Sequence, residues 1–253
     1  LDIDDEDRQR VWTEDADACL EHGHIATARA ILSCALDEFP DVLDIWQQAA
    51  RLERMHGTHE LFTALLERGV EQCPQAESLW LLYADDRRRA GDVSGARTIL
   101  ARAFDANLGS ESISLAAATL ESDLGDMHAA AKLLMRAREE VRTERVWITS
   151  VQVAWRQGAY DDALTLAKNA LERFPALEAV YTMQARLYET KGDLGAAREA
   201  LAAGRRACPT SIMLWLLSSR LEERTGALIR ARALLEKGRQ RAPCSFFCHV
   251  RMQ

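Results

Sequence analysis

The chain has 253 residues, of which 48% are apolar and 28% are charged, and its formal net charge is −7. This composition is typical of a folded globular protein, and with 5 prolines and 13 glycines it excludes a collagen-like or low-complexity chain. No apolar run is long enough to predict a transmembrane helix, and the acidic first residues do not resemble a secretory signal. The six cysteines predict free thiols in a reducing compartment.

The charge is unevenly distributed along the chain. Residues 1–40 carry 11 acidic and 3 basic side chains, whereas residues 201–253 carry 3 acidic and 10 basic ones. Such asymmetry predicts different partners at the two ends, or self-complementary stacking.

A regular period runs through the sequence. Seven glycines recur in steps of 34, with a single step of 33: Gly23, Gly57, Gly91, Gly125, Gly158, Gly192 and Gly226. If such a glycine is position i, every proline of the chain lies at i+17. Six of the glycines have an aromatic residue at i−11: Trp12, Trp46, Trp80, Trp147, Tyr181 and Trp215. Ser114 takes that place in the fourth repeat.

The period predicts a helix–turn–helix unit. The aromatic residue and a small residue four positions later share one face of a first helix. The glycine ends that helix in the left-handed conformation, and the proline stops the second helix. Because one unit cannot bury its apolar stripe alone, we expect the units to stack into a right-handed α-solenoid.

In chain order we expect an acidic lead-in, a single solenoid domain and the start of a further, truncated helix. The lead-in is 1–10, the domain is 11–243 and the truncated helix is 244–253. The seven repeats of the domain lie near 11–40, 44–74, 79–108, 113–142, 146–175, 180–209 and 214–243.

Several repeats share two dipeptides that point to a known repeat family. Leu-Glu occurs late in first helices, as in Leu52-Glu53, and Ala-Arg occurs early in second helices, as in Ala28-Arg29. The spacing resembles the tetratricopeptide (TPR) repeat, and the dipeptides resemble its half-a-TPR (HAT) variant, which is concentrated in RNA-processing proteins. The chain is similar throughout to the HAT-repeat family that bridges the spliceosomal tri-snRNP. The resemblance is carried by EDRQRVWTEDADAC (6–19), ERMHGT (53–58), CPQAESLWLLYA (73–84), AGDVSGARTIL (90–100), LAAATLESDLGD (115–126) and CPTSIMLWLLSSRLEERTG (208–226).

This resemblance implies a non-enzymatic scaffold for pre-mRNA splicing in the nucleus. Its partners would be other splicing-factor proteins of the tri-snRNP, with no cofactor, membrane or small-molecule substrate. Two alternatives remain open, a generic TPR adaptor of the co-chaperone type and an RNA-binding helical-repeat protein. Carboxylate-clamping co-chaperones use asparagines and lysines on first helices, and this chain has only Asn107 and Asn169, neither of which is expected there.

No nucleotide-binding, nucleophile-elbow or zinc-protease motif occurs, so we expect no catalytic residues. His22 and His24 flank a turn and are interpreted as solvated. Cys244, Cys248 and His249 are interpreted as the start of a helix rather than as metal ligands. We therefore expect no metal site.

The position five residues after each aromatic normally faces the inner surface of stacked repeats. It forms a polar row, which we call the strip: Asp17, Arg51, Asp85, Thr119, Gln152, Arg186 and Arg220. We expect every residue of the strip except Thr119 to contact a partner, together with Arg88 and Trp155. Trp155 is either an exposed anchor or an additional core residue.

Arg87, Arg88 and Arg89 form a basic cluster at the end of a first helix. Consecutive helical residues point about 100° apart, so this cluster is interpreted as a charged helix end rather than a phosphate site. The basic last repeat, residues 214–243, is the better place for an acidic partner or RNA, and we favour a protein partner there.

Overall fold

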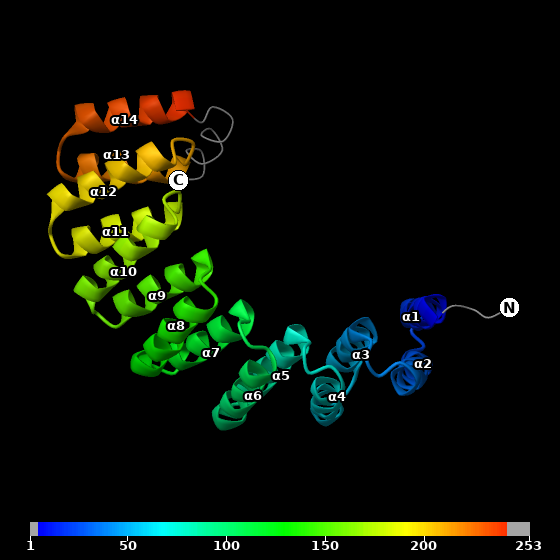
Figure 1. The fold of residues 1–253 in the computed structure, drawn as a ribbon. Coiled ribbons are helices and arrows are strands. Elements are labelled where there is room, and N and C mark those ends of the chain that lie inside the picture. Colours follow the sequence, from blue (N-terminus) through cyan, green and yellow to red (C-terminus); the bar gives the residue numbers. More distant parts are fainter. Residues whose placement is uncertain (1–4, 242–253) are drawn as a thin grey trace. The chain divides into compact units, whose positions relative to one another are not determined.

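The computed structural model describes residues 5–241, which form fourteen α-helices joined by short turns (Figure 1). In chain order they are α1 (Asp5–Glu21), α2 (Ile25–Glu38), α3 (Leu43–His56), α4 (His59–Gln72), α5 (Glu77–Arg89), α6 (Val93–Ala106), α7 (Glu111–Asp123), α8 (Met127–Glu140), α9 (Glu144–Arg156), α10 (Tyr160–Arg173), α11 (Glu178–Thr190), α12 (Leu194–Ala207), α13 (Ile212–Arg224) and α14 (Leu228–Arg241). The chain divides into two compact units, the N-terminal unit (Leu1–Ala117) and the C-terminal unit (Ala118–Gln253).

The expected all-α helical-repeat solenoid is confirmed. The first helix begins at Asp5 and so extends into the acidic lead-in expected over 1–10. The single domain over 11–243 and its repeat boundaries stay predictions, and the helix expected at 244–253 lies outside the described residues. Among the described helices, none combines the length and apolar character that crossing a membrane requires.

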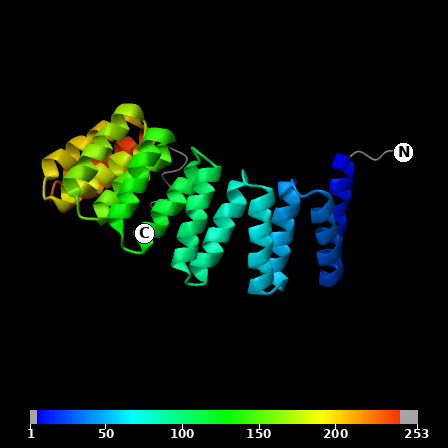
Figure 2. The same cartoon turned by 60° about the horizontal axis from the view of Figure 1, so that its bottom comes forward.

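Within each unit, the second helices α2, α4, α10 and α12 each pack against the first helix of their own repeat and that of the next repeat. In the N-terminal unit α2 contacts α1 and α3, and in the C-terminal unit α10 contacts α9 and α11 (Figures 1 and 2). This double contact buries the small residues that the period places on second helices, such as Ala28 and Ala163. Gly204 likewise allows α12 to lie close to α11, because an added Cβ would lie 2.9 Å from the Cβ of Tyr181. Stacking therefore completes the core that no single repeat can form.

The turn between the two helices of a repeat uses the periodic glycine in six of seven cases. These six have a positive φ between 78° and 84°, in the left-handed region. Gly57 is the exception, with φ −92°, so the expectation of a left-handed glycine is wrong there. The reason is a shorter connection, because α3 ends at His56 and α4 begins at His59. Thr58 caps α4 instead, accepting a hydrogen bond from the Leu61 N–H at 3.3 Å.

A side-chain hydrogen bond explains why prolines and aromatic residues share one period. The Trp46 indole donates to the Pro40 carbonyl at 2.8 Å, and Trp80 does the same to Pro74 at 2.8 Å. Equivalent bonds in the C-terminal unit run from the Tyr181 hydroxyl to Pro175 and from the Trp215 indole to Pro209. Each bond ties the first helix of one repeat to the turn that ends the previous repeat.

Candidate interaction surface

The strip residues lie on the first helices of their repeats. In the N-terminal unit, Asp17 is on α1 and Arg51 on α3, both exposed, while Asp85 on α5 is partly buried. In the C-terminal unit the exposed members are Thr119 on α7, Gln152 on α9, Arg186 on α11 and Arg220 on α13. Because α1 packs on α3, Asp17 and Arg51 lie on adjacent helices, and because α11 packs on both α9 and α13, so do Gln152, Arg186 and Arg220. This arrangement leaves polar groups of both signs open to solvent.

The arginine cluster at the end of α5 is neutralised locally. Asp85 pairs with Arg88 and with Arg89, each at 2.8 Å. Arg87 stacks over the Tyr83 ring and lies 3.7 Å from the Asp92 carboxylate. Its hydrogen bond to the Tyr83 hydroxyl raises the pKa of Arg87. The three cations therefore have partners within their own helix and turn, as expected for a charged helix end.

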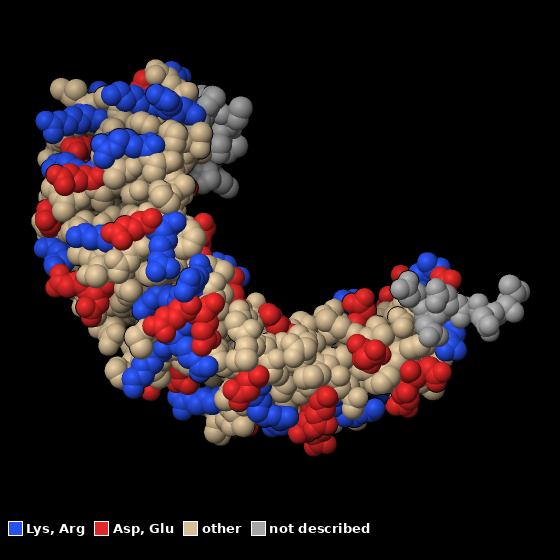
Figure 3. Space-filling view, viewed as in Figure 1, with Lys and Arg blue, Asp and Glu red and all other residues tan. Residues whose placement is uncertain are grey.

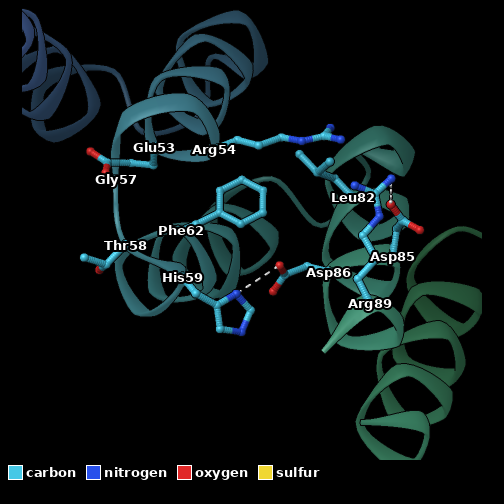
Figure 4. A pocket seen from close by; sticks show the side chains of 10 residues that line it. All are labelled: Glu53, Arg54, Gly57, Thr58, His59, Phe62, Leu82, Asp85, Asp86 and Arg89. Atoms are coloured by element: carbon cyan, nitrogen blue, oxygen red, sulfur yellow. Dashed lines mark ion pairs between the residues drawn. The ribbon is translucent and has the colours of Figure 1, made fainter. Parts of the chain in front are cut away.

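A small cavity of about 240 Å³ lies beside this cluster, between α3, α4 and α5. Figure 4 shows His59 and Asp86 facing each other across it, with the His59 Nδ1 3.3 Å from the Asp86 Oδ1. Thr63 also donates a hydrogen bond to Asp86, at 3.1 Å. Glu53 in the same wall is held by Arg29. Both carboxylates thus have hydrogen-bond or ion-pair partners within the fold.

Trp155 is partly buried rather than fully exposed. Its side chain packs against an apolar cluster that includes Trp147, Val151 and Ala163. The structure thus places it in the core of its repeat, and a contact with a partner there remains a proposal.

The last repeat carries exposed cations (Figure 3). Arg224 pairs with Glu189 at 2.8 Å and Arg239 with Glu236 at 2.7 Å. Arg230, Lys237 and Arg241 have no acidic partner among residues 5–241, and their spacing of seven and four places them on one side of α14. This side of α14 suits an acidic ligand.

No group of three or more His, Cys, Asp or Glu side chains within the described part of the chain could hold a metal ion. His22 at the α1–α2 turn makes a 2.9 Å hydrogen bond with the Ala18 carbonyl, and both His22 and His24 are exposed. The expected helix start at Cys244, Cys248 and His249 lies outside the residues that the structure describes.

Sequence reasoning missed the partners of the family dipeptides. The Arg29 guanidinium binds the Glu53 carboxylate at 2.5 Å, and Arg198 binds Glu222 at 2.7 Å. Each pair links the second helix of one repeat to the first helix of the next, and we call it a clasp. The side chain of Glu53 is 9% exposed and that of Arg29 is 41% exposed. The shared separation of 24 residues within each pair was a signal available in the sequence.

Comparisons with known proteins agree with the repeat architecture. Residues 3–117 match the family described as PRP39 N-terminal HAT repeat, and residues 149–212 match a tetratricopeptide repeat family. The first match spans nearly the whole N-terminal unit, and the second lies within the C-terminal unit. Residues 3–117 are therefore similar to HAT repeats and residues 149–212 to TPR repeats.

The solved structures that resemble the chain establish the fold alone, because their sequence identity is low. The C-terminal part of a TPR repeat protein from Cytophaga hutchinsonii aligns with a TM-score of 0.62 and 14% identity, covering 92% of this chain and 96% of that one. A tetratricopeptide repeat protein from Parabacteroides merdae aligns with a TM-score of 0.51 and 14% identity, covering 92% of both chains.

Two curated proteins match shorter segments at higher identity. Human pre-mRNA-processing factor 6 is 46% identical over 48 residues, which are 19% of this chain and 5% of that protein. Pre-mRNA-splicing factor prp1 of Schizosaccharomyces pombe is 42% identical over 50 residues, which are 20% of this chain and 6% of that protein. The matched segments thus span about a twentieth of these relatives. The chain is an all-α helical-repeat solenoid whose segments are similar to HAT and TPR repeats and, over about a fifth of its length, to two pre-mRNA splicing factors.

Proposed function

We propose that this chain is a non-enzymatic scaffold of pre-mRNA splicing in the nucleus. It bridges protein components of the spliceosomal tri-snRNP through the exposed polar strip on its first helices. The partial similarity to two splicing factors supports the process. The single observation that carries the mode of action is the row of polar side chains on packed neighbouring helices, which includes exposed groups of opposite sign at Asp17 and Arg51.

Such a row suits proteins better than a uniform polyanion. A nucleic acid track requires a continuous series of cations that neutralise phosphates. The strip instead combines two acidic, three basic and two neutral side chains, and Asp85 pairs with two nearby arginines, Arg88 and Arg89. Mixed charges of this kind favour selection of complementary protein surfaces and suppress wrong partners.

The test is capture of purified tri-snRNP proteins by the chain. Replacing the strip cations by Arg51→Glu and Arg186→Glu should reduce capture, while the melting temperature stays unchanged because both side chains are exposed. Lys168→Glu with Arg206→Glu is the matched control, since it reverses two exposed cations on the second helices α10 and α12. Equal capture by both double variants would remove the strip from the proposal, and failure of the unaltered chain to bind any tri-snRNP protein would remove the function.

RNA binding is the competing outcome. A single-stranded oligonucleotide should bind weakly and lose its affinity steeply as salt rises, because the exposed cations of the strip are interspersed with acidic and neutral groups and, even with those of α14, form no continuous track for phosphates in the described part of the chain. Tight, sequence-dependent binding of the oligonucleotide at physiological salt would favour an RNA-binding function instead.

A further inference from the structure

A groove opens between α8, α9 and α10 in the C-terminal unit. Its volume is about 510 Å³, whereas the corresponding groove between α2, α3 and α4 in the N-terminal unit has about 220 Å³. Leu134 lies at its base and is fully buried, and Met135 stands beside it with 53% of its surface exposed. Only the larger groove falls within the volume range that is typical of ligand sites, about 300–1,000 Å³.

The larger groove lies where two alanines replace a clasp. Counted from the periodic glycine and the aromatic residue of each repeat, Ala131 and Ala154 occupy the positions that Arg29 and Glu53 hold in the smaller groove. Both alanines line the open groove, and both members of the clasp line the smaller one. Two methyl groups thus replace an ion pair that spans the helices.

Other repeat contacts inside the two units are closed at this position. The clasp of Arg198 and Glu222 spans α12 and α13. Leu164 on α10 and Tyr188 on α11 belong to one apolar cluster. Thr63 on α4 holds the position of Arg29 and bonds to Asp86 on α5, one residue before the position of Glu53. Two alanines at these positions are therefore particular to the contact of α8 with α9.

Cations without acidic partners border the open groove. Neither Lys132 nor Arg138 pairs with a carboxylate among the described residues, although Arg138 is half-buried. Arg138 stacks over the Trp147 ring at 5.5 Å, and its burial lowers its pKa. In the smaller groove both arginines are paired, Arg29 with Glu53 and Arg68 with Asp37.

We propose that the groove between α8, α9 and α10 is a docking site for a segment of a partner protein that presents an apolar side chain beside a carboxylate. The apolar side chain packs over Leu134 and Met135, and the carboxylate binds Arg138 and Lys132. Asp162 is the single acidic residue of the lining, so the site retains an excess of positive charge. An apolar anchor in a pocket and a charge-assisted bond to arginine are the two contacts that contribute most at such sites.

The groove is separate from the strip. Gln152 lies two residues from Ser150, which lines the groove, and two residues correspond to about 200° around a helix. The two surfaces therefore occupy opposite sides of α9. The docking site goes beyond the proposed scaffold function, since it does not require the partners to be splicing proteins.

A variant in which an ion pair closes the groove tests the docking site directly. Short random peptides displayed on phage are selected on the full chain, and the enriched peptides are synthesised and titrated by fluorescence anisotropy. We expect an enriched pattern of an apolar residue next to Asp or Glu. The double substitution Ala131→Arg with Ala154→Glu builds a clasp in the groove and should raise the Kd of these peptides by about tenfold or more.

Two further variants keep the result decisive. Met135→Glu places a carboxylate at a position that is already 53% exposed, so the fold should tolerate it, and it should weaken binding even if the double variant folds poorly. Ser33→Glu, at the matching position of the smaller groove, should leave the Kd unchanged. Peptides that lack acidic residues, peptides that bind all variants equally, or a selection without enrichment would each overturn the proposal.

Discussion

Two inter-repeat contacts can be compared, that between the first and second repeats and that between the fourth and fifth repeats. Both follow the same sequence period, but different side-chain interactions hold them together. In the first, the Trp46 indole bonds to the Pro40 carbonyl and a clasp spans the helices. In the second, the Trp147 indole nitrogen is buried and has no hydrogen-bond partner within residues 5–241, and two alanines replace the clasp. A repeat can therefore keep its helices while it loses the hydrogen bond and the ion pair that join it to the neighbouring repeat.

The difference begins with one missing residue. Four residues connect α2 to α3, whereas three connect α8 to α9, which accounts for the single shortened step in the spacing of the glycines. Arg142 stands in place of the proline and adopts φ 58°, the left-handed region that non-glycine residues rarely enter. The shortened turn thus presents no carbonyl to Trp147, which stacks instead under Arg138 and Arg173.

The largest expected effect is the removal of the Trp46 side chain, which is 1% exposed. Trp46→Ala should lower the free energy of unfolding by about 3–5 kcal/mol, because the cavity and the lost bond to Pro40 add together. Urea unfolding followed by circular dichroism measures the change. Trp147→Ala should cost less, since Trp147 has no hydrogen bond to lose, and an equal or larger loss at Trp147 would contradict the comparison.

Breaking the clasp should have the next largest effect. Arg29→Ala should destabilise the chain by about 1–3 kcal/mol, because the Glu53 carboxylate, which is 9% exposed, is left buried without its partner. Glu53→Ala should cost less, since it leaves the more exposed Arg29 to water, and the double variant should cost less than the sum of the two single variants. Hydrogen exchange at α2–α4 measures the loss locally, and strictly additive effects would show that the pair contributes no coupling.

A third experiment isolates the indole bond. Trp46→Phe should cost about 0.5–1.5 kcal/mol more than Trp147→Phe, because only the first substitution deprives a carbonyl of its donor. Both variants keep an aromatic ring, so they serve as each other's control in the same unfolding experiment. Indistinguishable midpoints would mean that the bond to Pro40 makes no net contribution.

The smallest expected effect is at the shortened turn. Arg142→Gly should raise the free energy of unfolding by about 0.5–1 kcal/mol, because relief of the left-handed backbone is partly offset by the greater entropy that glycine loses on folding. Arg142→Pro should destabilise the chain, since the proline ring cannot adopt a positive φ. Stabilisation by proline would show that the turn is not held in this conformation.

Much of the architecture could be predicted from residue spacing alone. Glycines, prolines and aromatic residues that recur with one period were enough to predict paired helices, because each residue type has a conformational or packing role that depends only on near neighbours. The same reasoning failed at Gly57, where a shorter connection and the Thr58 cap replaced the left-handed turn. The strip could be placed on first helices from its register, and its role as a partner surface stays a prediction.

The clasps and the open groove were decided only by the tertiary structure. Arg29 and Glu53 lie 24 residues apart and meet because a second helix packs on the following first helix. Ala131 and Ala154 stand out in no sequence pattern, and only the packing of α8, α9 and α10 shows that they leave a hollow beside unpaired cations. The sequence by itself determined the helices and their period, since these follow from local conformation. The tertiary structure decided which contacts close, because that depends on side chains from different repeats meeting in space.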